Sequence, residues 1–398
     1  MEKYLSKRLQ GLAESQTLAM NQKTKDLQAR GLDIVNLTAG EPDFFTPAHI
    51  KAAAKAAVDA NYSFYTPVDG YPELRRAVAD KLRRENGLEY RPEQVVVSNG
   101  AKHALANAIL SLVDEGDEVV IPAPYWVSYA ELVKLAGGRP VVVRTSFEGG
   151  FKMSAAQLAA AITPRTKLLI LCSPSNPTGS VYRREELAAL AEVVAQHDRL
   201  FVLSDEIYEH IRFEGQHESI AQFPAVKDRV VLVNGVSKAY AMTGYRIGYL
   251  AAPLWIAKAC AKLQGQLTSN ASSIAQRAAI AALSGDNTPT REMVEAFRRR
   301  RDLVLRHLND MPGVRCGTPP AAFYVFPDVS AFFGRRDGST AIGNDADLCL
   351  YLLDKALVAG VPGSAFGEPT CIRFSYATSD ELLEKAMRSM KKALSNLT

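Results

Sequence analysis

The sequence lacks the features of several large classes of protein. Its apolar runs all fall short of the roughly 18 residues that a membrane-spanning helix needs, and its charged N-terminus has no apolar signal region. Its 47 basic residues nearly balance its 43 acidic ones, and a net charge of +4 is too small to indicate nucleic acid or membrane partners. We therefore expect a cytoplasmic protein that binds neither.

Cysteine is scarce and scattered. The chain has five cysteines, an odd number, and none forms a C-x-x-C pair. Several lie in apolar runs, which favours buried thiols in a reducing compartment over a disulfide framework.

Several catalytic signatures are also missing. No G-x-G-x-x-G follows a predicted strand, so a nicotinamide dehydrogenase is poorly supported, and there is no P-loop or G-x-S-x-G elbow. The histidines lack metal-ligand spacing, so we predict no metal site; those considered are His103, His197, His210 and His217.

What is present from residue 94 onward is an alternation of short apolar runs and helical patterns. The runs are rich in Val, Ile and Leu with little alternation, which is typical of strands covered on both faces. They span residues 94–98, 118–122, 140–144, 167–173, 200–204, 230–234 and 246–251. Because helical segments separate several of them, the pattern predicts an α/β fold with a mostly parallel seven-stranded sheet between helices.

After residue 253 the pattern changes to long helices at 254–284 and 291–310, and then to short strands mixed with helices. We predict a large domain at 46–310 and a smaller α/β domain at 311–398. An N-terminal arm at 1–45 is predicted to pack with the smaller domain. The basic run at 298–301 is interpreted as a solvated helix face.

Four short polar segments fall at the ends of predicted strands, where open α/β sheets place their ligands. They are Ser98-Asn-Gly-Ala-Lys102, Asn176-Pro-Thr-Gly179, Ser204-Asp-Glu-Ile-Tyr208, and Ser237-Lys238 with the nearby Arg246. Each alone is weak, since an Asn-Pro-x-Gly segment is by default a turn and an aspartate there is often only a helix cap. Their joint occurrence in this order is informative.

With these segments the sequence resembles the fold-type I pyridoxal-phosphate enzymes, and within them the class I aminotransferases. The most specific stretch is Asn234-Gly-Val-Ser-Lys-Ala-Tyr-Ala-Met-Thr-Gly-Tyr-Arg-Ile-Gly248, and the likeness extends from Leu37 to Ser375. It is greatest to the bacterial and plant branch of aspartate aminotransferases.

The resemblance implies pyridoxal 5'-phosphate bound as a Schiff base to Lys238, whose amine would also move protons at the substrate Cα. It assigns Asp205 to the pyridine nitrogen, Asn176 and Tyr208 to the ring's 3-oxygen, and Trp126 to the ring face. The expected catalytic residues are Lys238, Asp205 and Tyr208.

The resemblance also implies a phosphate site and a dimer. The helix start at Gly100-Ala101-Lys102 would bind the phosphate through backbone N–H groups, helped by Ser237 and Arg246. Tyr65 matches a phosphate-binding tyrosine donated by the neighbouring subunit. We therefore expect a homodimer with a shared active site.

On the substrate side, similarity gives Arg373 the α-carboxylate, with help from the Gly40 amide. The Lys102 side chain would reach a second carboxylate, with Trp126 and Asn176 also near the substrate. These assignments favour transamination of aspartate with 2-oxoglutarate, giving oxaloacetate and glutamate.

Several alternatives stay open on the same scaffold. Some members of this branch transaminate prephenate and carry a polar or basic residue in the N-terminal arm, where this chain has Ala13. Aromatic or alanine aminotransferases and a β-lyase are further alternatives, because function depends on the site rather than on the fold. A regulator built on such a domain would carry an added DNA-binding segment, and no such segment is seen.

Overall fold

The computed structural model describes residues 4–14 and 16–398. Residues 1–3 and 15 of the predicted arm lie outside the described residues. Among the helices described, none combines the length and apolar character needed to cross a bilayer.

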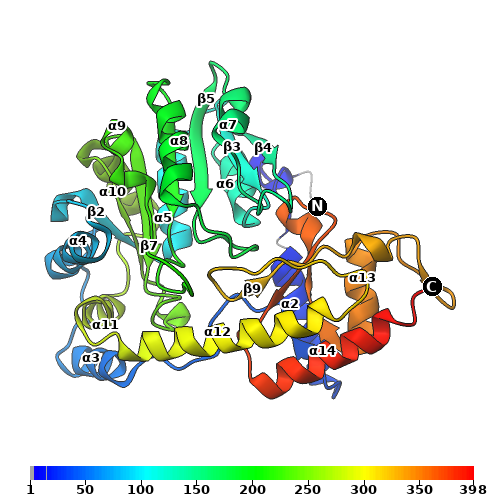
Figure 1. Ribbon diagram of the computed structural model, residues 1–398. Coiled ribbons are helices and arrows are strands. Elements are labelled where there is room, and N and C mark those ends of the chain that lie inside the picture. The colour runs from blue at the N-terminus through cyan, green and yellow to red at the C-terminus, as the bar shows by residue number, and fades with distance from the viewer. Residues whose placement is uncertain (1–3, 15) are drawn as a thin grey trace.

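A seven-stranded sheet forms the centre of the molecule, with strand order β2-β8-β7-β6-β5-β3-β4 (Figure 1). Its strands are β2 (Val95–Ser98), β3 (Glu118–Ala123), β4 (Arg139–Arg144), β5 (Thr166–Cys172), β6 (Phe201–Asp205), β7 (Val230–Gly235) and β8 (Gly248–Ala251). Only β8 runs antiparallel to its neighbours, β2 and β7. The predicted α/β class and mostly parallel sheet are confirmed.

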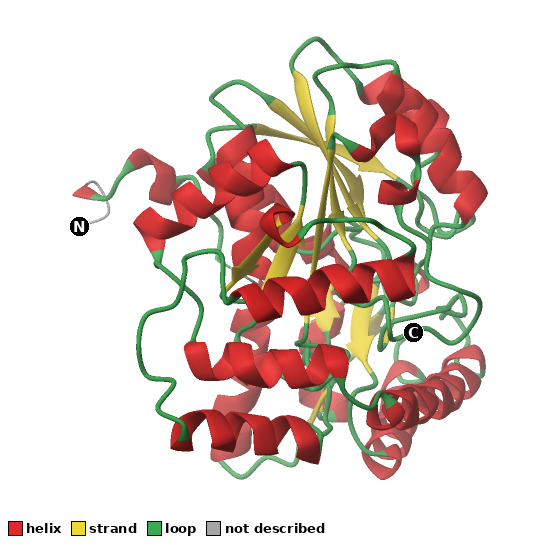
Figure 2. Ribbon diagram, turned by 90° about the vertical axis from the view of Figure 1, so that its left-hand side faces the viewer, coloured by secondary structure: helices red, strands yellow, loops and turns green. Residues whose placement is uncertain are grey.

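Helices cover both faces of this sheet (Figure 2). One face packs against α5 (Ala101–Leu112), α6 (Ser128–Leu135) and α10 (Leu254–Leu267). The other packs against α4 (Pro72–Asn86), α7 (Ala155–Ala161), α8 (Arg184–Ala195), α9 (Pro224–Lys227) and α11 (Ser273–Ser284), and α11 also contacts α3 (Ala48–Asp59). Successive residues of β5, such as Leu168 and Leu169, enter opposite cores. Burial on both faces therefore explains the continuous apolar runs.

The edge strand β4 departs from this pattern. Its residues are exposed or half-buried, and Val142 is 42% exposed. Since β4 has one sheet neighbour, β3, its side chains are only partly covered.

A separate core joins the C-terminal third to the N-terminal segment. It contains α12 (Thr288–Asn309), α13 (Asp345–Tyr351), the π-helical turn η6 (Leu352–Ala356) and α14 (Asp380–Leu394), with the strands β9 (Tyr324–Val325) and β14 (Ile372–Ser375). Strand β13 (Val361–Pro362) pairs with β14. The arm strand β1 (Val35–Asn36) pairs in parallel with β12 (Val358–Ala359). In Figure 1 the arm helix α2 (Gln16–Ala29) lies beside this part of the molecule. The boundaries at residues 45 and 310 stay a prediction.

The expectation of a solvated basic face at 298–301, on α12, is wrong for two of the four arginines in that run. Arg300 and Arg301 are 9% and 7% exposed. Arg300 binds Asp43 and Asp380, and Arg301 donates to the Pro319 carbonyl. Long side chains can pack their stems in a core while their charged ends find partners, which a charge run in the sequence does not reveal.

Candidate active site

A cavity of about 460 Å³ opens at the carboxyl ends of the parallel strands. Asp205 ends β6 and Cys172 ends β5, while Lys238 follows β7 and Ala101 opens the helix after β2. Because parallel strands end at one edge of a sheet, residues far apart in sequence meet there.

The cavity brings together most of the residues predicted for the site. Those that line it are Gly40, Ala101, Lys102, Trp126, Asn176, Asp205, Tyr208, Ser237, Lys238, Arg246 and Arg373. Gly100 lies directly before Ala101 as the N-cap of α5. Tyr65 does not line the cavity, and its side chain is 91% exposed.

Lys238 occupies one wall of the cavity. Its ammonium donates to the Gly40 carbonyl oxygen at 2.5 Å and lies 5.8 Å from the centre of the Tyr208 ring. Burial lowers the pKa of Lys238 to about 8, and the nearby Arg246 and Arg373 act in the same direction. A lysine with such a pKa has a substantial neutral fraction near pH 7–8, as a nucleophilic or proton-transferring amine requires.

Asp205 is a buried carboxylate at the base of the cavity. One oxygen accepts a 2.6 Å bond from the Tyr129 hydroxyl, and the other accepts from the Ile207 backbone N–H at 3.2 Å. Burial raises the pKa of Asp205 to about 6 despite these two bonds. A carboxylate held in this way favours a cationic partner that enters the cavity.

The start of α5 forms the opposite end of the cavity. Gly100 has φ +86°, and a side chain there would collide with the Arg246 guanidinium at 2.3 Å. Gly248 allows β8 to approach equally closely, because an added Cβ would lie 2.2 Å from the Ala101 nitrogen. First-turn amides of a helix have no intrahelical acceptor, so this end offers N–H groups beside a guanidinium.

Arg373 lies on β14 and is 1% exposed. Its guanidinium donates to Asn176 Oδ1 at 2.9 Å and to the Thr38 carbonyl at 2.8 Å. Within residues 4–14 and 16–398 its buried Nε has no hydrogen-bond partner. A buried guanidinium with an unused N–H is suited to an entering carboxylate.

Lys102 lies on the first turn of α5, and its ammonium is 4.9 Å from the centre of the Trp126 ring. Burial lowers the pKa of Lys102, and Arg246 adds to the shift. The residue is exposed to solvent, but it lines the cavity, as a lysine that binds a substrate group would.

Two tyrosines that the motifs did not indicate also contact the site. Tyr129 is hydrogen-bonded to Asp205, and Tyr324 pairs with the Tyr208 hydroxyl at 2.9 Å while its ring lies 4.6 Å from the Arg373 guanidinium carbon. Tyr129 follows the Tyr125-Trp126 pair by one helical turn, so helical spacing could have indicated it. Tyr324 lies in an apolar run without a local signal.

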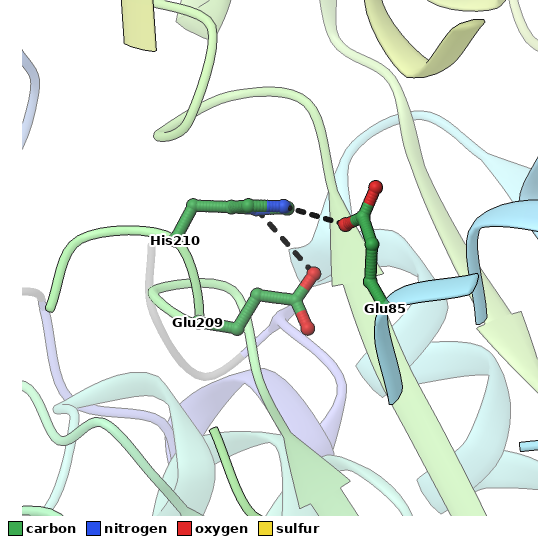
Figure 3. Close-up of side chains that lie close together, drawn as sticks. All are labelled: Glu85, Glu209 and His210. Atoms are coloured by element: carbon green, nitrogen blue, oxygen red, sulfur yellow. Dashed lines mark hydrogen bonds and ion pairs between the residues drawn. The ribbon is translucent and has the colours of Figure 1, made fainter. Parts of the chain in front are cut away.

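Two of the histidines that lack metal-ligand spacing in the sequence nevertheless lie beside glutamates. His210 Nε2 lies 2.8 Å from Glu85, and its Nδ1 lies 3.4 Å from Glu209 (Figure 3). His217 forms a similar group with Glu206 and Glu209. The absence of a metal stays a prediction.

Comparison with known proteins agrees with this geometry. The family model described as aminotransferase class I and II matches residues 32–390. The chain belongs to this aminotransferase family. The motif-based resemblance and the fold are thus confirmed together.

Relatives of this aminotransferase come from bacteria and plants. It is 51% identical to the aspartate/prephenate aminotransferase of Cereibacter sphaeroides, over 96% of each chain. It is 47% identical to the aspartate aminotransferase of Bacillus subtilis, over 98% of each. The crystal structure of the aspartate aminotransferase from Rhizobium meliloti superposes with a TM-score of 0.96 at 43% identity, over 99% of each chain.

Proposed function

We propose that this aminotransferase uses pyridoxal 5'-phosphate to transfer the amino group of aspartate to 2-oxoglutarate, giving oxaloacetate and glutamate. The observation that carries the proposal is one cavity that holds Lys238, the buried Asp205 and two separate cations, Lys102 and Arg373. A dicarboxylic amino acid needs two such cations, and the relatives named above act on aspartate.

The residues present fit the cofactor at both of its ends. Asp205 is a buried carboxylate with no cation bonded to it among the described residues, which suits a pyridinium nitrogen. The N-terminus of α5 with Arg246 and Ser237 suits a phosphate dianion. Trp126 offers an aromatic face, and Asn176 and Tyr208 offer donors to the 3-oxygen.

When bound, the cofactor supplies an electron sink for the pair left at the substrate Cα. The Lys238 amine would act as the base that removes the substrate Cα proton and as the acid that gives it back. Asp205 would pair with the cofactor's ring nitrogen and keep it protonated, while the Tyr129 hydroxyl, which donates to Asp205, holds that carboxylate in place.

Arg373 orients the substrate through its α-carboxylate, with the Gly40 amide beside it. Lys102 binds the distal carboxylate. Glutamate uses the same two cations, so both half-reactions proceed in one site. A neutral substrate would make no ion pair with the Lys102 ammonium, so we expect it to react less well than aspartate.

A homodimer is part of the proposal. Tyr65 is 91% exposed, and Phe45 and Phe64 are 91% and 79% exposed. Large aromatic side chains this exposed are candidates for interface residues. Tyr65 would complete the phosphate site of the second copy, and the protein would act in the cytoplasm.

Prephenate is the second candidate acceptor, because the Cereibacter sphaeroides relative is named for it. Ala13 provides no cation in the arm, and its backbone N–H bonds Glu131 on α6. Lys25 of α2, however, lines the cavity and is exposed. We therefore keep prephenate beside 2-oxoglutarate in the assay.

A panel of donors and acceptors tests the proposal. We expect kcat/KM to be highest for aspartate with 2-oxoglutarate, and borohydride reduction followed by peptide mapping to label Lys238. Aspartate ranking below alanine or phenylalanine would contradict the role of Lys102. Release of pyruvate and ammonia from a cysteine conjugate without an oxo acid would indicate a β-lyase.

A further inference from the structure

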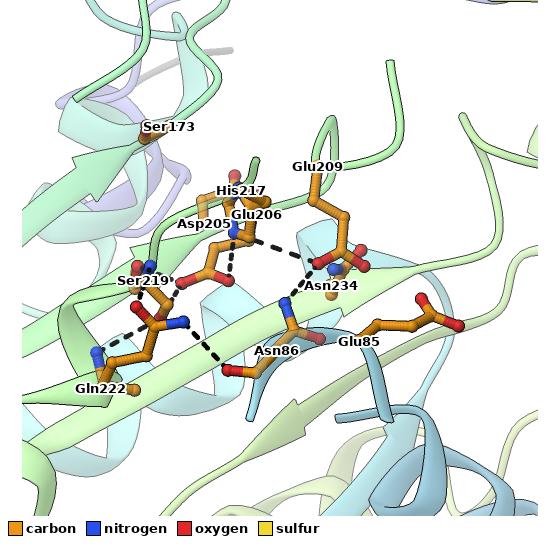
Figure 4. A network of polar contacts seen from close by, with 12 residues as sticks. Glu85, Asn86, Ser173, Asp205, Glu206, Glu209, His217, Ser219, Gln222 and Asn234 are labelled. Carbon is orange, nitrogen blue, oxygen red and sulfur yellow. Dashed lines mark hydrogen bonds and ion pairs between the residues drawn. The ribbon is translucent and has the colours of Figure 1, made fainter. Parts of the chain in front are cut away.

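The turn after β6 has two faces. Asp205 and Tyr208 line the cavity, whereas Glu206 and Glu209 do not. Both glutamates are buried, with 1% and 6% of their surface exposed. Figure 4 shows them with Asn86, His217 and Ser219 in a network of polar contacts.

Glu206 is held by three groups. The hydroxyls of Ser204 and Ser219 donate to one of its oxygens at 2.8 and 2.6 Å, and His217 Nε2 lies 2.7 Å from the other. Ser204 belongs to β6, while Ser219 and His217 follow the turn. The carboxylate therefore ties the end of the strand to the next segment of the chain.

Glu209 is held from the opposite side by α4. The buried Lys81 ammonium contacts its carboxylate, and the Asn86 amide donates at 2.8 Å. Burial opposes ionisation of Glu209, but Lys81, His210 and His217 outweigh it and lower its pKa. The glutamate is thus an anion fixed to a helix on the far side of the turn.

The network already contains its cation. Ligand atoms of Glu206, Glu209 and His217 lie within 4.8 Å of one another, a spacing that a metal ion could use. The Lys81 ammonium, 0% exposed, already neutralises Glu209 at this place. Buried ion pairs of this kind add little net stability but hold a defined geometry.

We propose that Glu206 and Glu209 are positioning residues, which fix Asp205 and Tyr208 against the cofactor and set the charge behind Asp205. Residues 205 and 208 alternate with 206 and 209 in one turn, so movement of either glutamate displaces a cavity residue. Glu206 also acts at a distance, because its charge is among the causes that raise the pKa of Asp205. This inference rests on the proposed function, since it assumes a cofactor against Asp205.

Two substitutions at Glu206 separate the effect of its contacts from the effect of its negative charge. Glu206→Ala removes every contact, and we expect the dissociation constant of pyridoxal phosphate to rise about tenfold. Glu206→Gln keeps the shape and should restore most of that affinity. It removes a negative charge near the cofactor, so the pH midpoint of the visible absorbance should fall by about half a unit.

A second variant keeps the inference testable if the Glu206 variants do not fold. Lys81→Met with Glu209→Gln removes both charges of the pair together, so neither is left unpaired in the core. We expect this double variant to weaken cofactor binding and lower kcat, with KM for aspartate unchanged.

Glu118→Gln is the matched control. Glu118 is also a buried, ion-paired carboxylate, but it lies at the opposite end of the sheet. We expect Glu118→Gln to lower Tm and leave the cofactor affinity and the absorbance midpoint unchanged.

The outcomes distinguish this inference from the function on which it rests. If the Glu206 variants and the double variant change only Tm, as the control does, the glutamates are merely structural and the inference is wrong. If the unaltered protein shows no cofactor absorbance, the proposed function itself fails. A normal spectrum in the unaltered protein, with shifted affinity and midpoint in the variants, supports both.

Discussion

The two ends of the central sheet each carry a buried carboxylate, and their surroundings differ. Glu118 begins β3 at the amino end, where Arg139, Arg165 and Thr163 bind it. These partners lower its pKa to about 2. Asp205 ends β6 at the carboxyl end, where burial raises its pKa to about 6.

This difference distinguishes a carboxylate that stabilises the fold from one that is suited to a function. The amino end satisfies its carboxylate with cations from the chain itself. At the carboxyl end, Asp205 accepts hydrogen bonds from a hydroxyl and a backbone N–H, which are both uncharged. Its carboxylate can therefore pair with a cation that enters the cavity. Strongly shifted groups in a cavity are candidates for function, whereas a fully paired group is more simply structural.

Lys238→Ala gives the largest expected effect. Transamination should fall by about 10⁴-fold or more, because both the attachment point and the proton-transferring amine are lost. The visible absorbance of the purified protein should disappear while its circular dichroism spectrum is retained. Normal activity in this variant would show that the carboxyl end is not the catalytic centre.

Asp205→Asn should reduce kcat by about 10²–10³-fold, since a neutral amide does not hold the pyridinium proton. In the cofactor-free protein, by contrast, we expect Asp205→Asn to raise the stability at neutral pH. An acid whose pKa is raised on folding contributes stability below its unfolded pKa of about 4 and loses it as pH rises through 6.

The cofactor-free Asp205→Asn variant should thus be more stable than the unaltered protein above pH 6, by roughly 2–3 kcal/mol, with no difference near pH 4. Denaturant unfolding at several pH values measures this. A variant less stable at pH 7 would contradict the assignment of an uncompensated carboxylate.

Lys102→Met should lower kcat/KM for aspartate by about 10²-fold and leave alanine nearly unchanged, because one charge-assisted bond to the distal carboxylate is lost. Steady-state kinetics with both donors provide the measurement. Equal losses for the two donors would assign Lys102 to the cofactor alone.

Glu118→Gln should have the smallest effect on activity. Its lowered pKa means that its contribution to stability is complete above pH 4.5 and is lost as pH falls toward 2. The variant should therefore have a lower Tm at pH 7 and a difference that shrinks in acid, with unchanged kcat. Thermal unfolding between pH 3 and pH 7 checks this sign.

Much of this arrangement could be predicted from the sequence. All seven strands of the sheet lie within about two residues of their predicted places, because runs buried on both faces are distinctive. Most of the residues predicted around Lys238 meet in one cavity, since many of them lie near the end of a strand or the start of a helix.

Other features have no local signal. The Lys81–Glu209 pair joins residues 128 positions apart. In the sequence, the charged residues of helix α4 are typical of a solvent-exposed helix face. Arg300 was interpreted as solvated because its partners, Asp43 and Asp380, lie in distant segments. Such contacts depend on tertiary packing, and a single sequence does not show them.

The strand order also has a consequence for how the chain is made. Strand β2 has one neighbour in the sheet, β8. The backbone of residues 95–98 therefore has no strand partner until residues 248–251 leave the ribosome. Arg373 is synthesised later still, because β14 follows β8 and the long helices after it. A nascent chain that ends between β8 and β14 would therefore hold Lys238 without Arg373, and the cavity would be completed only after the sheet has formed.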